Sequence, residues 1–341
     1  MSAFRSLTLD EVCEQLCQPK CTLIVYHIRS DADAVGSAFA LRELLQSMKI
    51  PALCACSDEV PERLRFLSEP AQGSVLLDDE LRIGHERVIS VDSASPAQLG
   101  ELFHTLHRDI DLMIDHHANG TVYADSYIDP MAAATGEIIY RIAKRLWELG
   151  RLSGISHRFS SCVYAAISSD TGCFRYANVT PATLRCAAEL LEAGVEAAEI
   201  NHRLFDSKTE QQILAEGEAA RRLRLYAGGR VAGICFPHAV KQAMALSDEH
   251  LETVIDIPRS VAGVEVAFAI RQPTEQRSFR ASLRSNGECD VAAVCAKFGG
   301  GGHKRAAGCT IEAVGIEAAE AALLREIMEN FFDYRSSGEK N

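Results

Sequence analysis

Short apolar runs alternate with amphipathic stretches along the first half of the chain. The runs at 22–27, 74–77, 87–91 and 111–114 have the length and composition of buried strands, and the stretches at 36–48, 135–149 and 181–192 have a helical period. Strands that alternate with helices are typical of βαβ units. The pattern therefore predicts an α/β fold with a parallel, doubly wound sheet in the first half.

The second half also alternates strands and helices, after a polar helical stretch. Residues 207–225 are polar and helical, and their apolar positions are too sparse for a deep core, which indicates a connection. Beyond it we expect strands at 230–236, 261–270 and 278–284 and helices at 247–255, 290–298 and 316–332. We therefore predict two domains, 1–195 and 226–335, joined by a helical linker at 196–225. The second is expected to be a smaller α/β domain on a mixed sheet.

The composition is that of a globular protein with a sizeable core. Of 341 residues, 47% are apolar and 24% are charged, which excludes disorder and fibrous repeats. No window approaches the roughly 18–20 consecutive apolar residues of a spanning helix, and the first residues lack a signal-peptide pattern. We therefore expect a cytoplasmic protein with no membrane partner. Twelve cysteines without a C-x-x-C pair favour reduced, packed thiols, with a metal or redox role as the alternative.

Four apolar runs of the first half each lead into acidic or histidine residues. The carboxyl ends of parallel strands meet at one edge of a sheet, where ligands bind in open α/β folds. The last run, 165–169, also fits a helix. The residues that follow the four runs are His27, Asp31 and Asp33; Asp92; Asp115, His116 and His117; and Asp170. The pattern thus brings five carboxylates and three imidazoles to one edge.

Such a cluster would repel itself without cations. One aspartate after a strand is usually a helix N-cap, and one buried histidine is usually a satisfied core residue, but four coincident acidic ends favour a site. Carboxylate and imidazole ligands without thiolate suit Mn²⁺, with Mg²⁺, Co²⁺ or Fe²⁺ as competitors. The ligands exceed what one ion needs. They therefore indicate two divalent cations roughly 3.5–4 Å apart, the arrangement used for in-line attack on phosphorus.

The charge distribution restricts the class of partner. A net charge of −12 argues against a protein that coats long nucleic acid, because such binding needs many lysines and arginines. Between Arg271 and Arg305, however, seven residues are basic and three are acidic. The same segment contains four glycines, 299–302, which let the backbone approach a phosphate, followed by His303. Arg284 can grip a phosphate bidentately. A solvated surface and a flexible turn are the alternatives to a basic substrate pocket.

These residues resemble the four motifs of the DHH phosphoesterases and their DHHA1 substrate domain. The motifs are His-Ile-Arg-Ser-Asp-Ala-Asp-Ala-Val-Gly-Ser at 27–37, Asp92, Asp115-His116-His117, Asp170-Thr171-Gly172, Ser282-Leu283-Arg284-Ser285, and Gly-Gly-Gly-Gly-His at 299–303 with Ala306-Ala307-Gly308. The resemblance runs from about residue 20 to 330. It implies a DHH catalytic domain, a DHHA1 domain and an active site in the cleft between them. Family members commonly have glycine and proline where this chain has Ala32 and Ser30.

The resemblance also implies a role for each motif residue. His27, Asp31, Asp92 and Asp170 would hold one cation, and Asp33, Asp92, His116 and Asp170 the other, with Asp92 and Asp170 bridging. His117 would face the substrate phosphate, while Asp115 would orient an imidazole. The substrate would also contact Ser282, Arg284, Gly300, Gly301, Gly302 and His303.

The order and spacing of the motifs resemble the compact subgroup of oligoribonucleases and 3′-phosphoadenosine-5′-phosphate phosphatases. The implied activity is the release of mononucleotides from short oligoribonucleotides or linear dinucleotides such as pApA, or removal of the 3′-phosphate of that bisphosphate. The alternatives are a pyrophosphatase or exopolyphosphatase, a RecJ-like exonuclease, and a catalytically silent nucleotide sensor. The glycine-histidine run disfavours the first, and the complete ligand set disfavours the last. Long duplex nucleic acid is not expected as a partner, and the oligomeric state stays open, a homodimer included.

Overall fold

The computed structural model describes residues 4–68, 84–106 and 109–338, except for the side chains of His303 and of residues 331–338. The predicted strand at 74–77 lies outside the described residues. The chain divides between Ser207 and Lys208 into two compact units. Each unit has a sheet and hydrophobic cores of its own.

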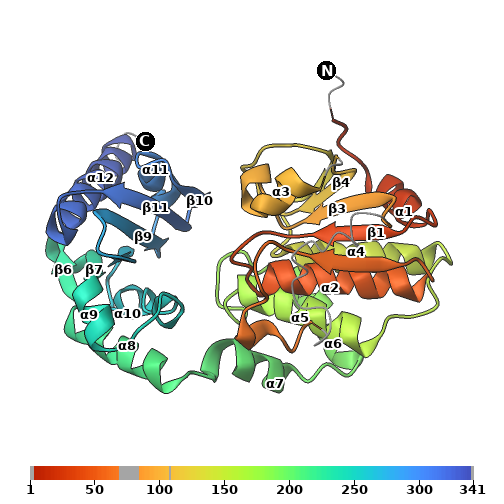
Figure 1. The fold of residues 1–341 in the computed structure, drawn as a ribbon, viewed down its shortest axis with the longest axis horizontal. Helices are drawn as coiled ribbons and strands as arrows, with labels where there is room; N and C mark the ends of the chain where they lie inside the picture. The colour runs from red at the N-terminus through yellow and green to blue at the C-terminus, as the bar shows by residue number, and fades with distance from the viewer. Residues whose placement is uncertain (1–3, 69–83, 107–108, 339–341) are drawn as a thin grey trace. The chain divides into compact units, whose positions relative to one another are not determined.

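The first unit contains a parallel five-stranded sheet in the order β2-β1-β3-β4-β5 (Figure 1). All four neighbouring pairs run parallel. The predicted parallel α/β fold is therefore confirmed. The strands are β1 (Thr22–Val25), β2 (Ala52–Ala55), β3 (Arg87–Val91), β4 (Leu112–Asp115) and β5 (Asp125–Ile128).

Side chains of the central strands alternate between two cores, because successive residues point to opposite faces of a sheet. Ile24 and Ile89 belong to the larger core, and Leu23 and Val88 belong to the smaller one. Figure 1 shows α3 on one side of the sheet and α2 and α5 on the other. The larger core is covered by α1 (Leu9–Leu16), α2 (Ala32–Ser47), α4 (Thr135–Glu148) and α5 (His157–Asp170), and the smaller by the 3-10 turn Pro96–Leu99 and α3 (Glu101–Thr105).

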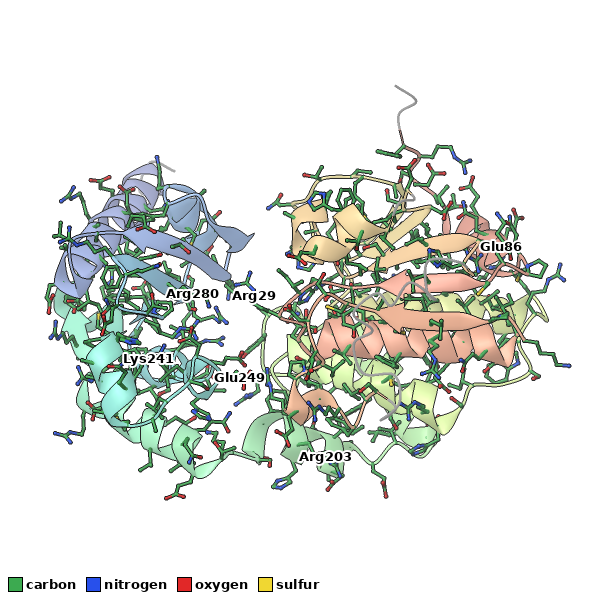
Figure 2. All side chains as sticks on the ribbon, viewed as in Figure 1. Arg29, Glu86, Arg203, Lys241, Glu249 and Arg280 are labelled. Carbon is green, nitrogen blue, oxygen red and sulfur yellow. The ribbon has the colours of Figure 1, made fainter. Side chains whose placement is uncertain are left out.

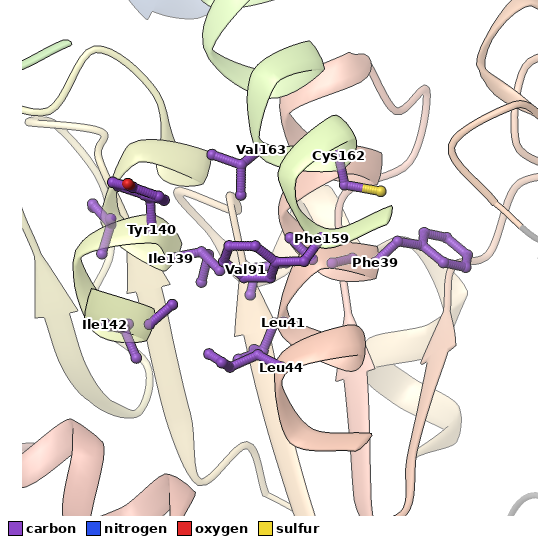
Figure 3. Packing of buried hydrophobic residues seen from close by; sticks show 14 of the residues in the cluster. Phe39, Leu41, Leu44, Val91, Ile139, Tyr140, Ile142, Phe159, Cys162 and Val163 are labelled. Carbon is purple, nitrogen blue, oxygen red and sulfur yellow. The ribbon is translucent and has the colours of Figure 1, made fainter. Parts of the chain in front are cut away.

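Helices α2, α4 and α5 also pack directly against one another (Figure 3). Two glycines permit the close approach. A Cβ at Gly36 would lie 2.5 Å from the carbonyl oxygen of Cys162, and a Cβ at Gly136 would lie 2.5 Å from the Cβ of Ala166. Since α2 begins beside Asp31 and α5 ends at Asp170, this packing sets the spacing of the candidate ligands.

The first unit differs from the sequence pattern in two respects. The run at 165–169 is the last part of α5, whose burial on nearly all sides hides its helical period. Strands β2 and β5, at the two edges of the sheet, were not predicted, and β5 is only partly buried and begins with Asp125. The remaining helices of this unit are α6 (Pro181–Glu192) and α7 (Ala197–Asn201), followed by a π-helical turn at His202–Asp206.

The second unit contains a six-stranded sheet in the order β10-β11-β9-β8-β7-β6, and the predicted mixed character of this sheet is confirmed. Only β7 and β8 run parallel among the paired strands. The strands are β6 (Arg224–Tyr226), β7 (Val231–Phe236), β8 (Val266–Arg271), β9 (Ser278–Ser285), β10 (Gly301–His303) and β11 (Ala306–Glu312). The helices are α8 (Glu210–Arg221), α9 (His238–Ala243), α10 (Asp256–Arg259), α11 (Val291–Ala296) and α12 (Ile316–Gly338).

The two faces of the second sheet are covered unequally. One face packs along β7, β8, β9 and β11 against α11 and α12. The opposite face is covered over β7 and β8 by a core that includes Ala215 and Ala219 of α8 and Leu251. On β9, Phe279, Ala281 and Leu283 are buried, and Arg280, Ser282 and Arg284 alternate with them on the other side. This alternation places the predicted substrate residues Ser282 and Arg284 on one face of one strand.

Two predicted elements of the second unit differ from the structure. The segment at 247–255 forms a 3-10 turn, Glu249–Leu251, rather than a helix of nine residues. Strand β8 begins at Val266 because residues 261–264 form a turn, with Gly263 at φ 84° and the Val264 N–H bonded to the Val261 carbonyl. Strands β10 and β11 were not predicted, since their glycines and alanines resemble a loop.

Within the described residues, none of the helices combines the length and the apolar character needed to cross a membrane.

Candidate active site

The first candidate ligands lie in the connection between β1 and α2. Asp31 is the N-cap of α2, and its Oδ1 accepts the N–H groups of Asp33 and Ala34 at 3.1 and 3.0 Å. Its carboxylate also lies 3.7 Å from Nε2 of His27. Ala32 is the first residue of α2 and has a helical backbone, so this loop does not require glycine there. Asp31 therefore combines a capping role with a place in the cluster.

Asp33 is fully buried and held by three donors. Its carboxylate accepts the Ser37 hydroxyl at 2.8 Å, the Thr135 N–H at 2.7 Å and the Gly136 N–H at 2.9 Å. The last two donors are the first residues of α4, where unpaired N–H groups favour an anion. The α4 N-terminus thus fixes a ligand that belongs to α2.

Asp92 follows β3 and lies between the two histidines. Its φ of 51° is in the left-handed region that few non-glycine residues adopt. The buried carboxylate accepts the Thr135 hydroxyl at 3.0 Å. Asp92 Oδ2 is 3.6 Å from Nε2 of His27, and Oδ1 is 3.7 Å from Nε2 of His116. Each oxygen of one carboxylate therefore faces a different histidine.

The remaining ligands come from the ends of β4 and α5. His116 Nε2 lies 3.3 Å from Asp170 Oδ2 and 3.7 Å from Asp33 Oδ2. Asp170 is the last residue of α5, although the neighbouring ligands follow strands. Three groups of possible ligand atoms result: His27 with Asp31 and Asp92, Asp33 with His116 and Asp170, and Asp92 with His116 and His117.

The donor atoms of the first two groups fit divalent cations. The nitrogen–oxygen separations of 3.3–3.7 Å exceed a charged hydrogen bond of about 2.7–2.9 Å. They suit two ligands of one cation, because bonds of about 2.0–2.2 Å place adjacent ligand atoms somewhat over 3 Å apart. Nδ1 of His27 and Nδ1 of His116 face the carbonyls of Ile28 and Ala132, at 2.8 and 3.4 Å. Both rings thus present Nε2 to the cluster.

The electrostatics of the cluster also call for added positive charge. Burial raises the pKa of Asp170 to about 6, with Asp31 and Asp92 adding to the rise and His116 opposing it. Burial raises the pKa of Asp33 well above its ordinary value, and the Asp92 and Asp170 charges raise it further. For His116, burial disfavours the charged form, but Asp170, Asp33 and Asp92 raise the pKa to about 11. The buried carboxylates of Asp33 and Asp170 are thus only partly compensated by His116.

His117 differs from the other two histidines. Its Nδ1 lies 2.7 Å from Asp115 Oδ1, which also accepts the N–H groups of His116 and His117. The same Nδ1 is 3.7 Å from Asp92 and could be counted as a metal ligand. The short bond to Asp115 argues against that reading, because it occupies this nitrogen. Burial opposes protonation of His117, but Asp115 and Asp92 raise its pKa.

The predicted substrate residues of the second unit lie on β9 and around β10. Ser282 Oγ is 3.5 Å from Arg271 Nη2, and Arg284 Nη1 donates to the Leu283 carbonyl at 3.0 Å. Nearby basic residues include Lys241 and Arg280, which both pair with Asp248 (Figure 2). Arg280, Ser282 and Arg284 lie on this face of β9, at every second residue. Part of the positive charge in this unit is therefore neutralised by Asp248 of the same unit.

The glycine run has more than one structural reason. A Cβ at Gly300 would lie 2.2 Å from the Gly308 carbonyl oxygen, and one at Gly302 would lie 2.5 Å from the Ala306 carbonyl oxygen. These two glycines are thus explained by packing against β11. Gly301 has open space where a Cβ would be. The backbone of His303, the last residue of β10, pairs with Ala306 of β11. The side chain of His303 is outside the described part of the chain.

Sequence reasoning missed the residues that support the ligands. These are Ser37, Thr135 and Gly136 around Asp33, and Asn178, whose Nδ2 donates to the carbonyls of Ala133 and Asp170 at 3.0 and 3.1 Å. A helix that begins with Thr-Gly after three alanines indicates N–H groups that have no partner within the helix and can hold an anion. Nothing in the local pattern indicated Asn178, because both of its contacts are formed by tertiary folding.

Comparisons with known proteins agree with this arrangement. The DHH family N-terminal domain matches residues 21–167, and the DHHA1 domain matches residues 238–332. The chain is 28% identical over 309 residues to the bifunctional oligoribonuclease and PAP phosphatase NrnA of Thermus thermophilus, which covers 90% of this chain and 89% of that protein. It is 25% identical over 295 residues to the protein of the same name from Bacillus subtilis, covering 85% and 89%.

A solved structure shows the same fold. An exopolyphosphatase-related protein from Bacteroides fragilis superimposes with a TM-score of 0.85 at 22% sequence identity, covering 94% of this chain and 95% of that one. The two domain matches follow one another in the order that the motifs predicted and together span most of the chain. The chain therefore belongs to the DHH family and carries a DHHA1 domain after its DHH domain.

Proposed function

We propose that this chain is a two-metal phosphohydrolase that releases mononucleotides from short oligoribonucleotides or linear dinucleotides such as pApA. In the same proposal it removes the 3′-phosphate of 3′-phosphoadenosine-5′-phosphate. The observation that carries the proposal is Asp92, whose two carboxylate oxygens face two different histidines. The names of the Thermus thermophilus and Bacillus subtilis relatives support the substrate class.

The metal ligands in this proposal are His27, Asp31, Asp33, Asp92, His116 and Asp170, with Asp92 and Asp170 shared. Bound there, two divalent cations, Mn²⁺ being the first to test, would activate water and neutralise the charge of a phosphate under in-line attack. The protein holds the candidate ligands in place by its own hydrogen bonds. Ser37 and the start of α4 fix Asp33, and the Thr135 hydroxyl fixes Asp92. Such preorganisation reduces the rearrangement needed during reaction.

His117 would contact the phosphate that is attacked. Asp115 accepts from Nδ1 of His117 and so orients the ring, which presents its Nε2 edge away from Asp115. The raised pKa of His117 favours the imidazolium form near neutral pH, which can donate a proton or a hydrogen bond to a phosphate oxygen. Asp115 is buried and acts through His117 rather than on the substrate.

The DHHA1 domain would bind the nucleotide that adjoins the reacting phosphate. Arg284 and Ser282 occupy one face of β9, and Gly301 is open to a close backbone approach. A guanidinium, a hydroxyl and backbone N–H groups are groups that recognise a phosphate. His303 is assigned to this role from its motif position alone.

The main rival is a pyrophosphatase or exopolyphosphatase built on the same catalytic domain. Family-II pyrophosphatases carry another C-terminal domain, so the DHHA1 match disfavours this rival. A silent sensor is disfavoured because the ligand atoms lie within reach of common cations.

A substrate panel tests the proposal. Release of phosphate or mononucleotide is measured with Mn²⁺ and Mg²⁺ in parallel from 3′-phosphoadenosine-5′-phosphate, pApA, a pentamer, a 24-mer and pyrophosphate. We expect turnover of the first three and a fall in rate beyond about five nucleotides, because a local basic pocket neutralises few phosphates. Equal rates on the 24-mer and pApA would contradict the length preference. Turnover of pyrophosphate alone would replace the proposal by its rival.

The role of His117 can be separated from metal binding. His117→Ala should keep its Mn²⁺ affinity and lose roughly 10²- to 10⁴-fold in kcat, the usual effect of removing a general acid or base. Isothermal titration calorimetry measures the first quantity and pApA turnover the second. A loss of Mn²⁺ binding in His117→Ala would instead make His117 a ligand.

A further inference from the structure

The turn that follows Asp170 has an unusual backbone. Gly172, Cys173 and Phe174 are consecutive residues with φ of 55°, 58° and 61°. Left-handed conformations are uncommon for residues other than glycine, and two such residues in succession cost free energy. Strain of this kind persists only where surrounding contacts enforce it. The contacts that hold this turn and the side chain that it carries are therefore of interest.

Several contacts enforce the turn. The Cys173 N–H donates to the Ser168 carbonyl at 2.7 Å, and the Phe174 N–H donates to the Thr171 hydroxyl at 3.0 Å. The ring of Tyr176 packs so closely on Gly172 that a Cβ there would lie 2.2 Å from the ring. Asn178 closes the far end through the Asp170 carbonyl. The segment is thus a built structure rather than a loose loop.

The turn carries the exposed side chain of Arg175. Its Nε donates to the Gly172 carbonyl at 2.6 Å, which fixes the guanidinium to the turn two residues beyond Asp170. The side chain is exposed, and no carboxylate in the described part of the chain pairs with it. The printed bond uses Nε alone and leaves the two Nη groups as further donors. A guanidinium held in this way loses little entropy on binding an anion.

The location of Arg175 suits a phosphate. Asp170 is a candidate metal ligand, so the turn lies at the rim of the cluster. Two other arginines of this unit, Arg145 and Arg203, pair with the acids Asp10 and Glu199. Arg175 follows the candidate metal ligand Asp170, and no carboxylate in the described part of the chain pairs with its side chain. Its two Nη groups therefore remain as donors for a phosphate.

We propose that Arg175 binds a phosphate oxygen of the substrate, and that the strained turn 171–176 exists to hold its guanidinium in place. This inference rests on the proposed function, because it names a further substrate contact of the same site. Arg175 is a binding residue in this proposal, and Asn178 and Gly172 are positioning residues that act through the turn.

Kinetics on pApA and calorimetry test the proposal. Arg175→Ala should raise KM by roughly 10- to 150-fold, the range for loss of a charged hydrogen bond, while Mn²⁺ affinity and Tm stay unchanged. Arg175→Lys retains the charge and should recover part of the loss. The matched control is Arg151→Ala, which removes another exposed arginine of the first unit and should leave KM unchanged. An unchanged KM in Arg175→Ala would overturn the proposal, as would a loss of Mn²⁺ binding.

Binding of inorganic phosphate separates this inference from the proposed function. The probe is titrated by calorimetry into Mg²⁺-loaded wild-type protein and Arg175→Ala. If the wild type hydrolyses no substrate of the panel but binds phosphate at least tenfold more tightly than Arg175→Ala, the contact stands and the proposed function fails. If the wild type is active and both proteins bind phosphate equally, the function stands and the contact is wrong.

Discussion

Several carboxylates of the first unit lie closer together than their charges permit without compensation. Asp33 and Asp170 both have raised pKa values because they are buried beside Asp92. In the absence of cations this arrangement costs folding free energy, and bound cations recover it. A site of this kind is organised for its ligand rather than for the stability of the free protein.

Replacing Asp170 should therefore separate stability from function. Asp170→Asn removes one buried charge, so the metal-free protein should be as stable as the wild type or slightly more stable. The sign follows from the raised pKa: a carboxyl that binds its proton more tightly when folded opposes folding at a pH where it is ionised. The same variant should lose Mn²⁺ binding and nearly all turnover.

Thermal unfolding in EDTA and with added Mn²⁺ measures both effects. Wild-type Tm should rise with Mn²⁺, while the Tm of Asp170→Asn should not. The exposed Asp109→Asn serves as the control and should behave as the wild type. Normal metal content and full activity in Asp170→Asn would refute its assignment as a ligand.

At the scale of elements, the contact between α2 and α5 sets the geometry of the site. Gly36→Ala would place a Cβ 2.5 Å from the Cys162 carbonyl oxygen, so the two helices must separate. We expect a destabilisation of about 1–3 kcal/mol, the usual cost of overpacking. Mn²⁺ affinity should also fall, because the helices carry Asp33 and Asp170.

A second glycine provides the matched control. Gly217 lies inside α8 with open space around the site of its missing Cβ. Gly217→Ala should therefore stabilise the protein by about 0.5–1 kcal/mol through helix propensity. Urea unfolding of the metal-free variants measures both changes. If Gly36→Ala stabilised the chain as Gly217→Ala does, the helix contact would not limit the site.

The connection from β5 to α4 depends on Asp129. Its carboxylate accepts the Met131 N–H at 2.9 Å and Arg141 Nη1 at 2.7 Å, and the loop beyond it supplies the Ala132 carbonyl to His116. Burial alone would raise the pKa of Asp129, but the Met131 N–H and the Arg141 guanidinium lower it below its ordinary value. The ionised carboxylate therefore stabilises the fold.

This stabilisation should depend on pH in a defined direction. A lowered pKa contributes stability above the unfolded value of about 3.9, and the contribution disappears as the pH falls through the folded value. Asp129→Asn should cost about 1–3 kcal/mol at pH 7 and little at pH 3 or below. Unfolding of the metal-free proteins at both pH values checks this, and a difference that persists at low pH would exclude the charged contact.

At the scale of the whole molecule, the proposed function divides the work between the two units. The candidate metal ligands lie in the first unit, while the candidate substrate residues Ser282, Arg284 and the glycine run lie in the second. Arg284→Ala should cost roughly 10- to 150-fold in kcat/KM for pApA, the range for one charged hydrogen bond. A small activated phosphodiester without a second nucleotide should be hydrolysed almost as before. Asp31→Ala should abolish turnover of both.

The comparison between substrates tests this division directly. If Arg284→Ala impairs the small ester as severely as pApA, the second unit contributes to the chemistry and not only to binding. A fall in kcat for pApA alone remains compatible with the division, because a nucleotide held in the wrong place misaligns its phosphate.

The sequence by itself determined that the first unit has a parallel sheet, located its three central strands and identified its candidate ligands. Parallel strands buried on both faces appear as continuous apolar runs, and acidic residues at their ends are visible without any structure. His27, Asp92, Asp115 and His116 could therefore be found one at a time. The helix α6 was predicted to the residue, because Thr180 and Pro181 mark its start and Gly194 follows its end.

Only the tertiary structure decided how these residues are held. The run before Asp170 fitted a strand or a helix, because burial on nearly all sides removes the period that distinguishes them, and the structure shows that it is helical. The left-handed backbone of Asp92, the support of Asp33 by α4 and the tether from Asn178 all join segments far apart in the chain. Gly300 and Gly302 were predicted to let the backbone approach a phosphate, and the structure adds that both pack closely against β11. Local patterns record burial and capping, whereas contacts between distant segments arise only when the chain has folded.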